Sequence, residues 1–107
     1  MGSPQYGRLV LDGEEVTGAL SIEPRSLLWS TDGSRLAAQE LVSWHDAPET
    51  RVVVFDTRNR VRIAASRPRT GLGTPVRFES DLLIYRHWHE QAERELRLVI
   101  DDKTQSR

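Results

Sequence analysis

Arginine is the residue type whose spacing in this sequence most clearly suggests chemistry. Arg58, Arg60 and Arg62 occupy alternate positions, which a β-strand would direct to one side, and Arg67 and Arg69 follow in the adjoining segment. Guanidinium groups match phosphate and carboxylate groups with paired hydrogen bonds. We therefore predict a site for an anionic ligand. Its residues are Arg58, Arg60, Arg62, Arg67, Arg69 and Arg77.

The charges of the chain are distributed unevenly, although its net charge is only −1. Residues 12–50 carry eight acidic side chains and two arginines, a net −6, whereas residues 51–77 carry seven arginines and one aspartate, a net +6. The local field of the second segment therefore says more about a partner than the total charge does. Two interpretations of the arginines stay open: a working surface, or a solvated face that the acidic half of the same domain neutralises.

Histidine and glycine clusters give no pattern of an active site or a metal centre. His87 and His89 lie two residues apart in a stretch expected to be helical, where such positions do not share a face, and no second pair of ligands is present. His45-Asp46 lacks a serine in a glycine-flanked turn that would act as the nucleophile. Residues 71–74 resemble a phosphate loop but lack a lysine, so we interpret them as a flexible loop. We expect a non-catalytic domain without a metal or cofactor.

The tryptophans and leucines supply the candidate apolar contacts. We expect Trp29 and Trp88 in the core because large aromatic side chains at core spacing are more often buried than exposed. The position of Trp44 stays open between core and surface. Leu83 and Leu98 lie off the apolar stripe of the expected helix, and with a histidine they would form an exposed seam. The possible protein contacts are therefore Trp44, Leu83, His87 and Leu98.

The last long stretch, residues 80–100, predicts an amphipathic helix from about residue 81 to 100. Its apolar residues recur three or four positions apart: Tyr85, Trp88, Ala92, Leu96 and Val99. Ser80 and Asp81 would cap the first turn. Replacing a core tryptophan at position 88 by alanine would then lower the free energy of unfolding by roughly 3–5 kcal/mol.

Earlier segments predict about seven short strands joined by tight turns. The expected strands are residues 8–11, 16–22, 27–29, 35–38 with 41–44, 51–56, 60–63 and 76–79. Residues 36–40 would also suit one helical turn. The segment 51–56 is apolar on both faces, which is typical of the most buried strands. Two prolines and two glycines within 66–75 predict a loop.

This order of elements predicts an α+β domain, mainly β: a bent seven-stranded antiparallel barrel or sandwich capped by one C-terminal helix. The pattern resembles the pleckstrin-homology (PH-like) superfamily. The likeness rests on Gly18-x-Leu20 followed by Leu27-Leu28-Trp29, and on a final helix with Trp88 after a strand with Phe78. We expect one domain over residues 6–101, with flexible tails at 1–5 and 102–107.

Two branches of that superfamily are the most similar. The N-terminal PH-like domain of ceramide and sphingosine kinases has a similar Ser21–Pro24 strand end, which implies membrane or phosphoinositide targeting of a lipid kinase. The PH domain of the large TFIIH subunit has a similar Gly18–Leu20 strand, which implies docking of acidic peptides. The first turn, residues 12–15, departs from both because its acidic side chains would repel a phosphorylated headgroup.

The sequence thus predicts an interaction module for an anionic membrane lipid or, as the alternative, an acidic protein segment; we do not expect a nucleic acid partner. The absence of cysteine and of a signal-like N-terminus favours an intracellular, cytoplasmic location, peripheral to a membrane in the first case and nuclear in the second.

Overall fold

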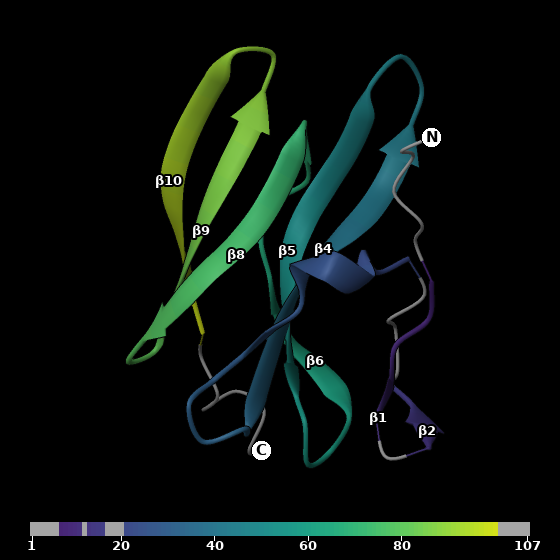
Figure 1. The fold of residues 1–107 in the computed structure, drawn as a ribbon, viewed down its shortest axis with the longest axis vertical. Coiled ribbons are helices and arrows are strands. Elements are labelled where there is room, and N and C mark those ends of the chain that lie inside the picture. Colours follow the sequence, from purple (N-terminus) through teal and green to yellow (C-terminus); the bar gives the residue numbers. More distant parts are fainter. Residues whose placement is uncertain (1–6, 12, 17–20, 101–107) are drawn as a thin grey trace.

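The computed structural model describes residues 7–11, 13–16 and 21–100. These residues form ten β-strands and one short 3-10 helix, η1 (Figure 1). The elements are β1 (Val10–Leu11), β2 (Glu14–Glu15), η1 (Pro24–Ser26), β3 (Leu28–Trp29), β4 (Arg35–Trp44), β5 (Pro48–Asp56), β6 (Val61–Ala65), β7 (Arg69–Thr70), β8 (Leu72–Glu79), β9 (Leu82–His89) and β10 (Ala92–Val99).

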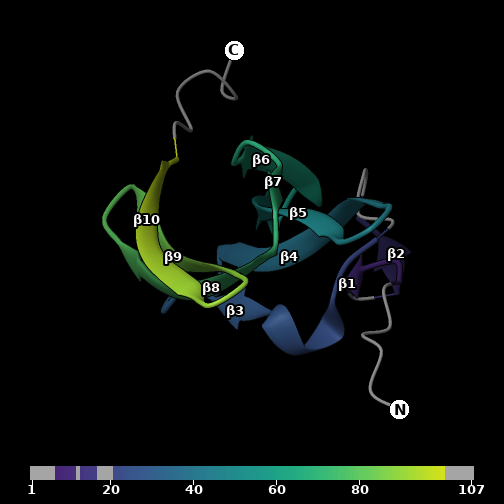
Figure 2. The ribbon, with the colours of Figure 1, turned by 90° about the horizontal axis from the view of Figure 1, so that it is seen from above.

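The strands form three antiparallel sheets. The largest has the order β3-β4-β5-β6, with the short β7 also paired to β5; the second has the order β10-β9-β8, and β1 pairs with β2. In Figure 2 the β8–β10 sheet curves along one side of β4 and β5, and the β1–β2 hairpin lies on their other side. The central strands β4 and β5 are therefore covered on both faces.

Burial follows from this central position. Val53 and Phe55 of β5 pack with β4 and the N-terminal segment, whereas Val52 and Val54 pack against the β8–β10 sheet. All four side chains are fully buried. The prediction that 51–56 would be among the most buried strands is confirmed, because a strand apolar at consecutive positions needs a partner on each face.

The predicted C-terminal helix is wrong, and with it the α+β fold capped by a helix. The described part of the chain is nearly all β without a closed barrel, and residues 80–100 form the hairpin of β9 and β10. Ser80, at φ 53°, belongs to the turn between β8 and β9 instead of capping a helix. Within the described residues no helix is both long enough and apolar enough to cross a membrane.

The geometry of this hairpin explains part of its resemblance to a helix. Its two-residue turn sets Tyr85 opposite Leu96, 11 residues apart, a separation that also shares one face of a helix. The other residues of the predicted stripe, Trp88, Ala92 and Val99, are exposed in the hairpin. Packing of Tyr85 and Leu96 in the core cluster with β4 and β5 favours the hairpin.

Several strand predictions need smaller corrections. The segment 35–44 is one ten-residue strand, β4, and contains no helical turn. The predicted loop 66–75 holds β7 and the beginning of β8. Within 16–22, Val16 and Ile22 are buried, and Ile22 bridges Gly7 and Glu40. Residues 17–20, on which part of that strand and of the PH-like resemblance rested, lie outside the described residues, as do the predicted tails 1–5 and 102–107.

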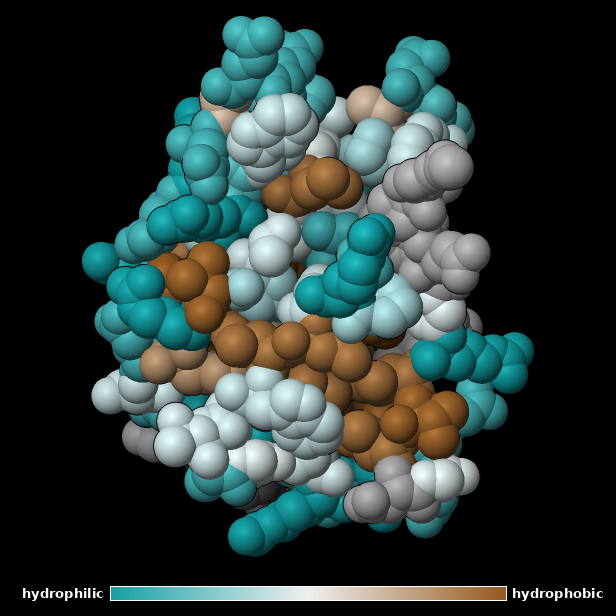
Figure 3. All heavy atoms as spheres, viewed as in Figure 1, coloured by the Kyte–Doolittle hydropathy of each residue, from teal (hydrophilic) through white to brown (hydrophobic). Residues whose placement is uncertain are grey.

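The predicted burial of two tryptophans is also wrong. Trp29 and Trp88 are each 51 % exposed, so neither belongs to the core. Figure 3 shows a hydrophobic band across the middle and lower part of one face, where the blue η1–β3 segment of Figure 1, which ends at Trp29, runs. A severe loss of stability on truncating Trp88 is therefore no longer expected.

Candidate anion-binding clefts

The six predicted arginines do not form one surface. Arg60 lies before β6 in a turn with φ 56° and pairs with Glu14 of β2 at 3.6 Å. Arg62 approaches Glu40 of β4 at 3.9 Å. Both glutamates come from the acidic half of the sequence. For these two arginines the structure matches the interpretation of a face neutralised by the same domain.

Arg62 belongs to a small cluster of charged side chains around Glu40. The Glu40 side chain is 9 % exposed and accepts a hydrogen bond from Nε of Arg51 at 2.6 Å. A buried carboxylate needs such partners, since its charge is costly away from water. Arg62 is thereby engaged in holding β4, β5 and β6 together.

Arg77 also has an acidic partner within the domain. Its Nε donates to Glu79 at 2.5 Å on the same strand, β8. This hydrogen bond and the charge of Glu79 raise the pKa of the Arg77 guanidinium, to which the nearby Glu95 also contributes. The remaining predicted arginines, Arg58, Arg67 and Arg69, make no ion pair with another residue of the described ranges.

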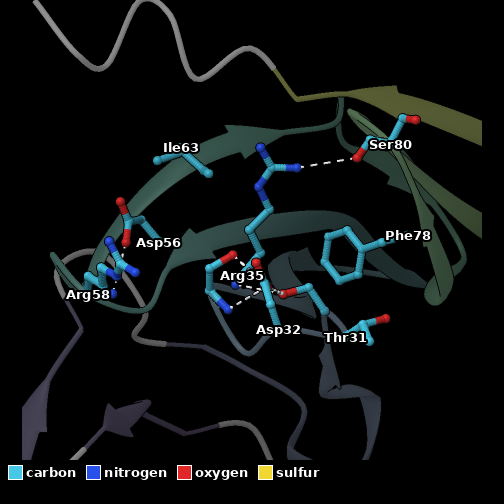
Figure 4. A pocket seen from close by; sticks show the side chains of 10 residues that line it. Thr31, Asp32, Arg35, Asp56, Arg58, Ile63, Phe78 and Ser80 are labelled. Carbon is cyan, nitrogen blue, oxygen red and sulfur yellow. Dashed lines mark hydrogen bonds between the residues drawn. The ribbon is translucent and has the colours of Figure 1, made fainter.

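Arg58 lines an open cleft of about 650 Å³, which we call the serine cleft (Figure 4). Its lining residues are Ser30, Thr31, Asp32, Ser34, Arg35, Asp56, Arg58, Ile63, Phe78 and Ser80. In Figure 4, Arg35 reaches from β4 across the cleft, where its Nη1 donates to the carbonyl of Ser80 at 3.4 Å. Asp81 forms an ion pair with the same guanidinium group at 3.6 Å.

The two carboxylates of the serine cleft are held by their own turns. Oδ1 of Asp32 accepts hydrogen bonds from the amide and hydroxyl of Ser34 and from the hydroxyl of Ser30. These bonds lower the pKa of Asp32 from 3.8 to about 2. Asp56 accepts in the same way from the amides of Arg58 and Asn59. With two arginines and two aspartates, this cleft is electrically balanced.

A smaller cleft of about 320 Å³ lies between β7 and the β9–β10 hairpin, and we call it the histidine cleft. Its lining residues are Arg69, Thr70, His87, His89, Glu90, Ala92 and Arg94. Arg94 lies directly opposite His87 in the hairpin. Neither Arg69 nor Arg94 makes an ion pair within the described part of the chain, and Glu90 approaches only His89, at 3.9 Å. This cleft therefore has an excess of positive charge.

The β7–β8 corner at Gly71 adjoins the histidine cleft, because it packs closely against Trp88 and His89. Gly71 has φ 114°, and a Cβ there would lie 2.3 Å from the carbonyl oxygen of Trp88 and 2.8 Å from Cβ of His89. Thr50 fixes the corner, because its hydroxyl donates to the Gly71 carbonyl at 2.7 Å and accepts from the Gly73 amide at 3.0 Å. The prediction of a flexible loop at 71–74 is wrong: its two glycines are buried parts of a hydrogen-bonded corner.

The two histidines share a face because they lie on a strand, where side chains two apart point the same way. The prediction that His87 and His89 do not share a face assumed a helix and is wrong. Nε2 of His87 lies 2.7 Å from the carbonyl oxygen of Thr70, so Nε2 carries a hydrogen in this contact. No group of three or more acidic or histidine side chains in the described ranges is arranged to hold a metal ion.

The predicted apolar seam is not on the surface. Leu83 is fully buried, and Leu98 packs against the same core cluster, so the expectation that they are exposed is wrong. Trp44 is 51 % exposed at the end of β4. It lies opposite Pro48, whose carbonyl accepts from the Gly71 amide, and Trp88 lies opposite Leu72. Trp44 is thus a half-exposed tryptophan near the Gly71 corner, whereas Trp88, between the two histidines on its strand, points to the opposite face of the sheet.

Sequence reasoning missed Arg94 and His89 as site residues. The signal was the alternation of Tyr85, His87 and His89, which places both histidines on the inner face once the segment is read as a strand. The contribution of Arg94 depends on the hairpin register, which the helical interpretation could not supply.

Comparison with known proteins adds no relative: no family model, no curated protein and no solved structure matches the chain. The PH-like resemblance therefore gains no support from these comparisons, and one of its two features, the final helix, is absent.

Proposed function

We propose that this protein is a non-catalytic interaction module that binds an anionic group in the histidine cleft. The observation that carries the proposal is the convergence of Arg69 and Arg94 on one cleft with two histidines. These arginines come from different strands, and no acidic residue of the described ranges pairs with either of them. Guanidinium groups without such partners are available to form paired hydrogen bonds with a ligand.

A phosphorylated ligand suits this arrangement best. Phosphate offers several oxygen acceptors, and the cleft offers two guanidinium groups together with two imidazoles, whose ring N–H groups are hydrogen-bond donors. The serine cleft is less suitable, although it is larger, because Asp32 and Asp56 would repel an anion there. We take the phosphorylated group to belong to a membrane lipid, so that the module acts in membrane targeting inside the cell.

An acidic protein segment is the second candidate, and an exposed tryptophan favours it. Trp44 is half exposed near the Gly71 corner, and tryptophan is a frequent anchor residue in protein–protein interfaces. A peptide would place its acidic side chain between the arginines and an apolar side chain on Trp44.

Three probes separate the proposal from its competitors: a soluble inositol polyphosphate, vesicles that contain phosphoinositides, and an acidic peptide with one aromatic residue. We expect the polyphosphate to bind in a calorimetric titration, more weakly at high salt because exposed charges are screened. An Arg69→Ala, Arg94→Ala double variant should lose about tenfold or more in affinity, on the order of 1.4 kcal/mol.

Arg67→Ala is the matched control because Arg67 is exposed in the adjoining segment but does not line the cleft. Its affinity should stay close to that of the wild type. Failure of all three probes to bind would reject the proposal, as would equal losses in the control and the double variant. Binding of the peptide alone would favour the second candidate.

A further inference from the structure

Strand β10 forms the edge of its sheet. It pairs along its length with β9, and no other strand of the described ranges is hydrogen-bonded to it. In Figure 1, β10 lies along the left margin of the molecule. Alternate residues of an edge strand direct their N–H and C=O groups outward, where they can pair with another strand. An eight-residue edge is long enough to add a partner strand with a defined register.

The side chains of this edge alternate in a way that suits a second copy of the same strand. Glu95 and Arg97 are exposed on the outer face, two residues apart, and Leu96 lies between them on the inner face. No ion pair joins Glu95 or Arg97 to another described residue, although Glu95 is close enough to contribute to the raised pKa of Arg77. Each of these charges is thus available to an opposite charge across the edge.

We propose that two copies of this chain associate through their β10 strands, antiparallel and centred on Leu96. In this register Leu96 faces Leu96 of the second copy, and Glu95 faces Arg97 of the second copy on both sides of the two-fold axis. Such opposite-charge pairs stabilise an antiparallel sheet. The two three-stranded sheets become one continuous sheet around an isologous, closed interface.

Neighbouring registers are disfavoured by like charges. Centring on Glu95 sets that carboxylate opposite itself, and centring on Arg97 does the same with its guanidinium group. The register on Leu96 avoids both conflicts, while Arg94 faces Leu98 and Glu93 faces Val99 with the aliphatic parts of their side chains. Val99, 66 % exposed in one copy, gains cover in this arrangement.

Charge exchange tests the interface and its register together. We expect the dimer dissociation constant, from analytical ultracentrifugation over a wide concentration range, to rise about tenfold or more in Glu95→Arg, since both cross-copy pairs become repulsive. Arg97→Glu should act in the same way. The double variant Glu95→Arg, Arg97→Glu restores opposite charges and should recover the dimer. A monomer at all concentrations, or single variants that dimerise like the wild type, would overturn the proposal.

A cross-link gives an independent test because the chain has no cysteine. Directly opposed residues have Cα atoms about 4.5–5.5 Å apart, within the range of a disulfide. Leu96→Cys should therefore form a covalent dimer on mild oxidation. Leu98→Cys is the matched control, since its counterpart lies about 13 Å away along the strand. Equal cross-linking of both variants would exclude this register. Neither test involves the histidine cleft, so the outcome is separate from that of ligand binding.

Discussion

The serine cleft and the histidine cleft differ in how their charges are already satisfied. The larger one contains as many acidic as basic side chains, and hydrogen bonds from its own turns hold both carboxylates. The smaller one gathers Arg69 and Arg94 beside two histidines, with Glu90 as its acidic residue. Volume alone would favour the serine cleft as a ligand site, whereas the available charge favours the histidine cleft. The local balance of charge is therefore the better guide to an anionic ligand here.

The largest expected effect is the disruption of the corner beside the histidine cleft in Gly71→Ala. The new methyl group would collide with a backbone carbonyl, and its residue would be held at φ 114°. We expect a loss of about 3 kcal/mol or more in unfolding free energy. Gly33→Ala is the matched control, because Gly33 has φ 76° and open space around it, and it should cost about 1–2 kcal/mol. If chemical denaturation showed the same loss of unfolding free energy for Gly71→Ala and Gly33→Ala, the close packing around Gly71 would be contradicted.

Charge reversal in each cleft tests the comparison directly. Arg94→Glu places a carboxylate in the histidine cleft and should weaken binding of a soluble inositol polyphosphate about tenfold or more, that is, by about 1.4 kcal/mol or more. Arg58→Glu makes the serine cleft acidic and should change that affinity by less than about twofold, since interactions between distant exposed charges are screened. Isothermal titration of both variants measures the difference. A larger effect of Arg58→Glu would move the site to the serine cleft.

Truncation of the exposed tryptophan on β9 should affect stability only slightly. Trp88 is 51 % exposed, so Trp88→Ala should cost about 1 kcal/mol, in contrast to roughly 3–5 kcal/mol for Phe55→Ala in the core. Thermal unfolding of the two variants compares them. If Trp88→Ala were as damaging as Phe55→Ala, the tryptophan would be buried, contrary to its exposed position on β9.

The smallest expected effect is the pH dependence that Asp32 adds to the serine cleft. Its pKa of about 2 is lower in the folded protein than its ordinary value of 3.8. A lowered carboxyl pKa stabilises the fold above the ordinary value, and this contribution is lost as the pH falls from about 4 toward about 2. An NMR titration should find the Asp32 midpoint near 2, and Ser34→Ala should raise it. A midpoint that Ser34→Ala leaves unchanged would refute the role of these hydrogen bonds.

Local sequence patterns predicted those parts of the fold that depend on local chemistry. The consecutive apolar residues Val52–Phe55 indicated a strand buried on both faces, and they form the centre of the molecule. The expected tight turns between strands rest on residue types that hydrogen-bond their own backbone or accept a positive φ, such as Asp32 and Gly33 between β3 and β4. Each of these features is decided within a few residues, which is why no knowledge of the rest of the chain was needed.

The candidate site could be predicted only in part. Arg69 and His87 were recognised as candidates, but the expected common surface of six arginines was not present. Arg60 and Arg62 pair with Glu14 and Glu40, residues more than twenty positions earlier in the chain. Spacing along the sequence cannot show which charges meet across a sheet, because pairing depends on strand order and register.

By itself, the sequence determined a domain rich in short strands, with an acidic first half and a basic segment after it. Tertiary structure alone decided that residues 80–100 form a hairpin, since a separation of 11 residues, as between Tyr85 and Leu96, suits both a helix and two paired strands. The apolar residues on one face of β4 and β5 favour the hairpin over a helix, because the curved β8–β10 sheet covers both strands at once. The hairpin also brings Arg94 opposite His87 and makes β10 an edge strand of its sheet.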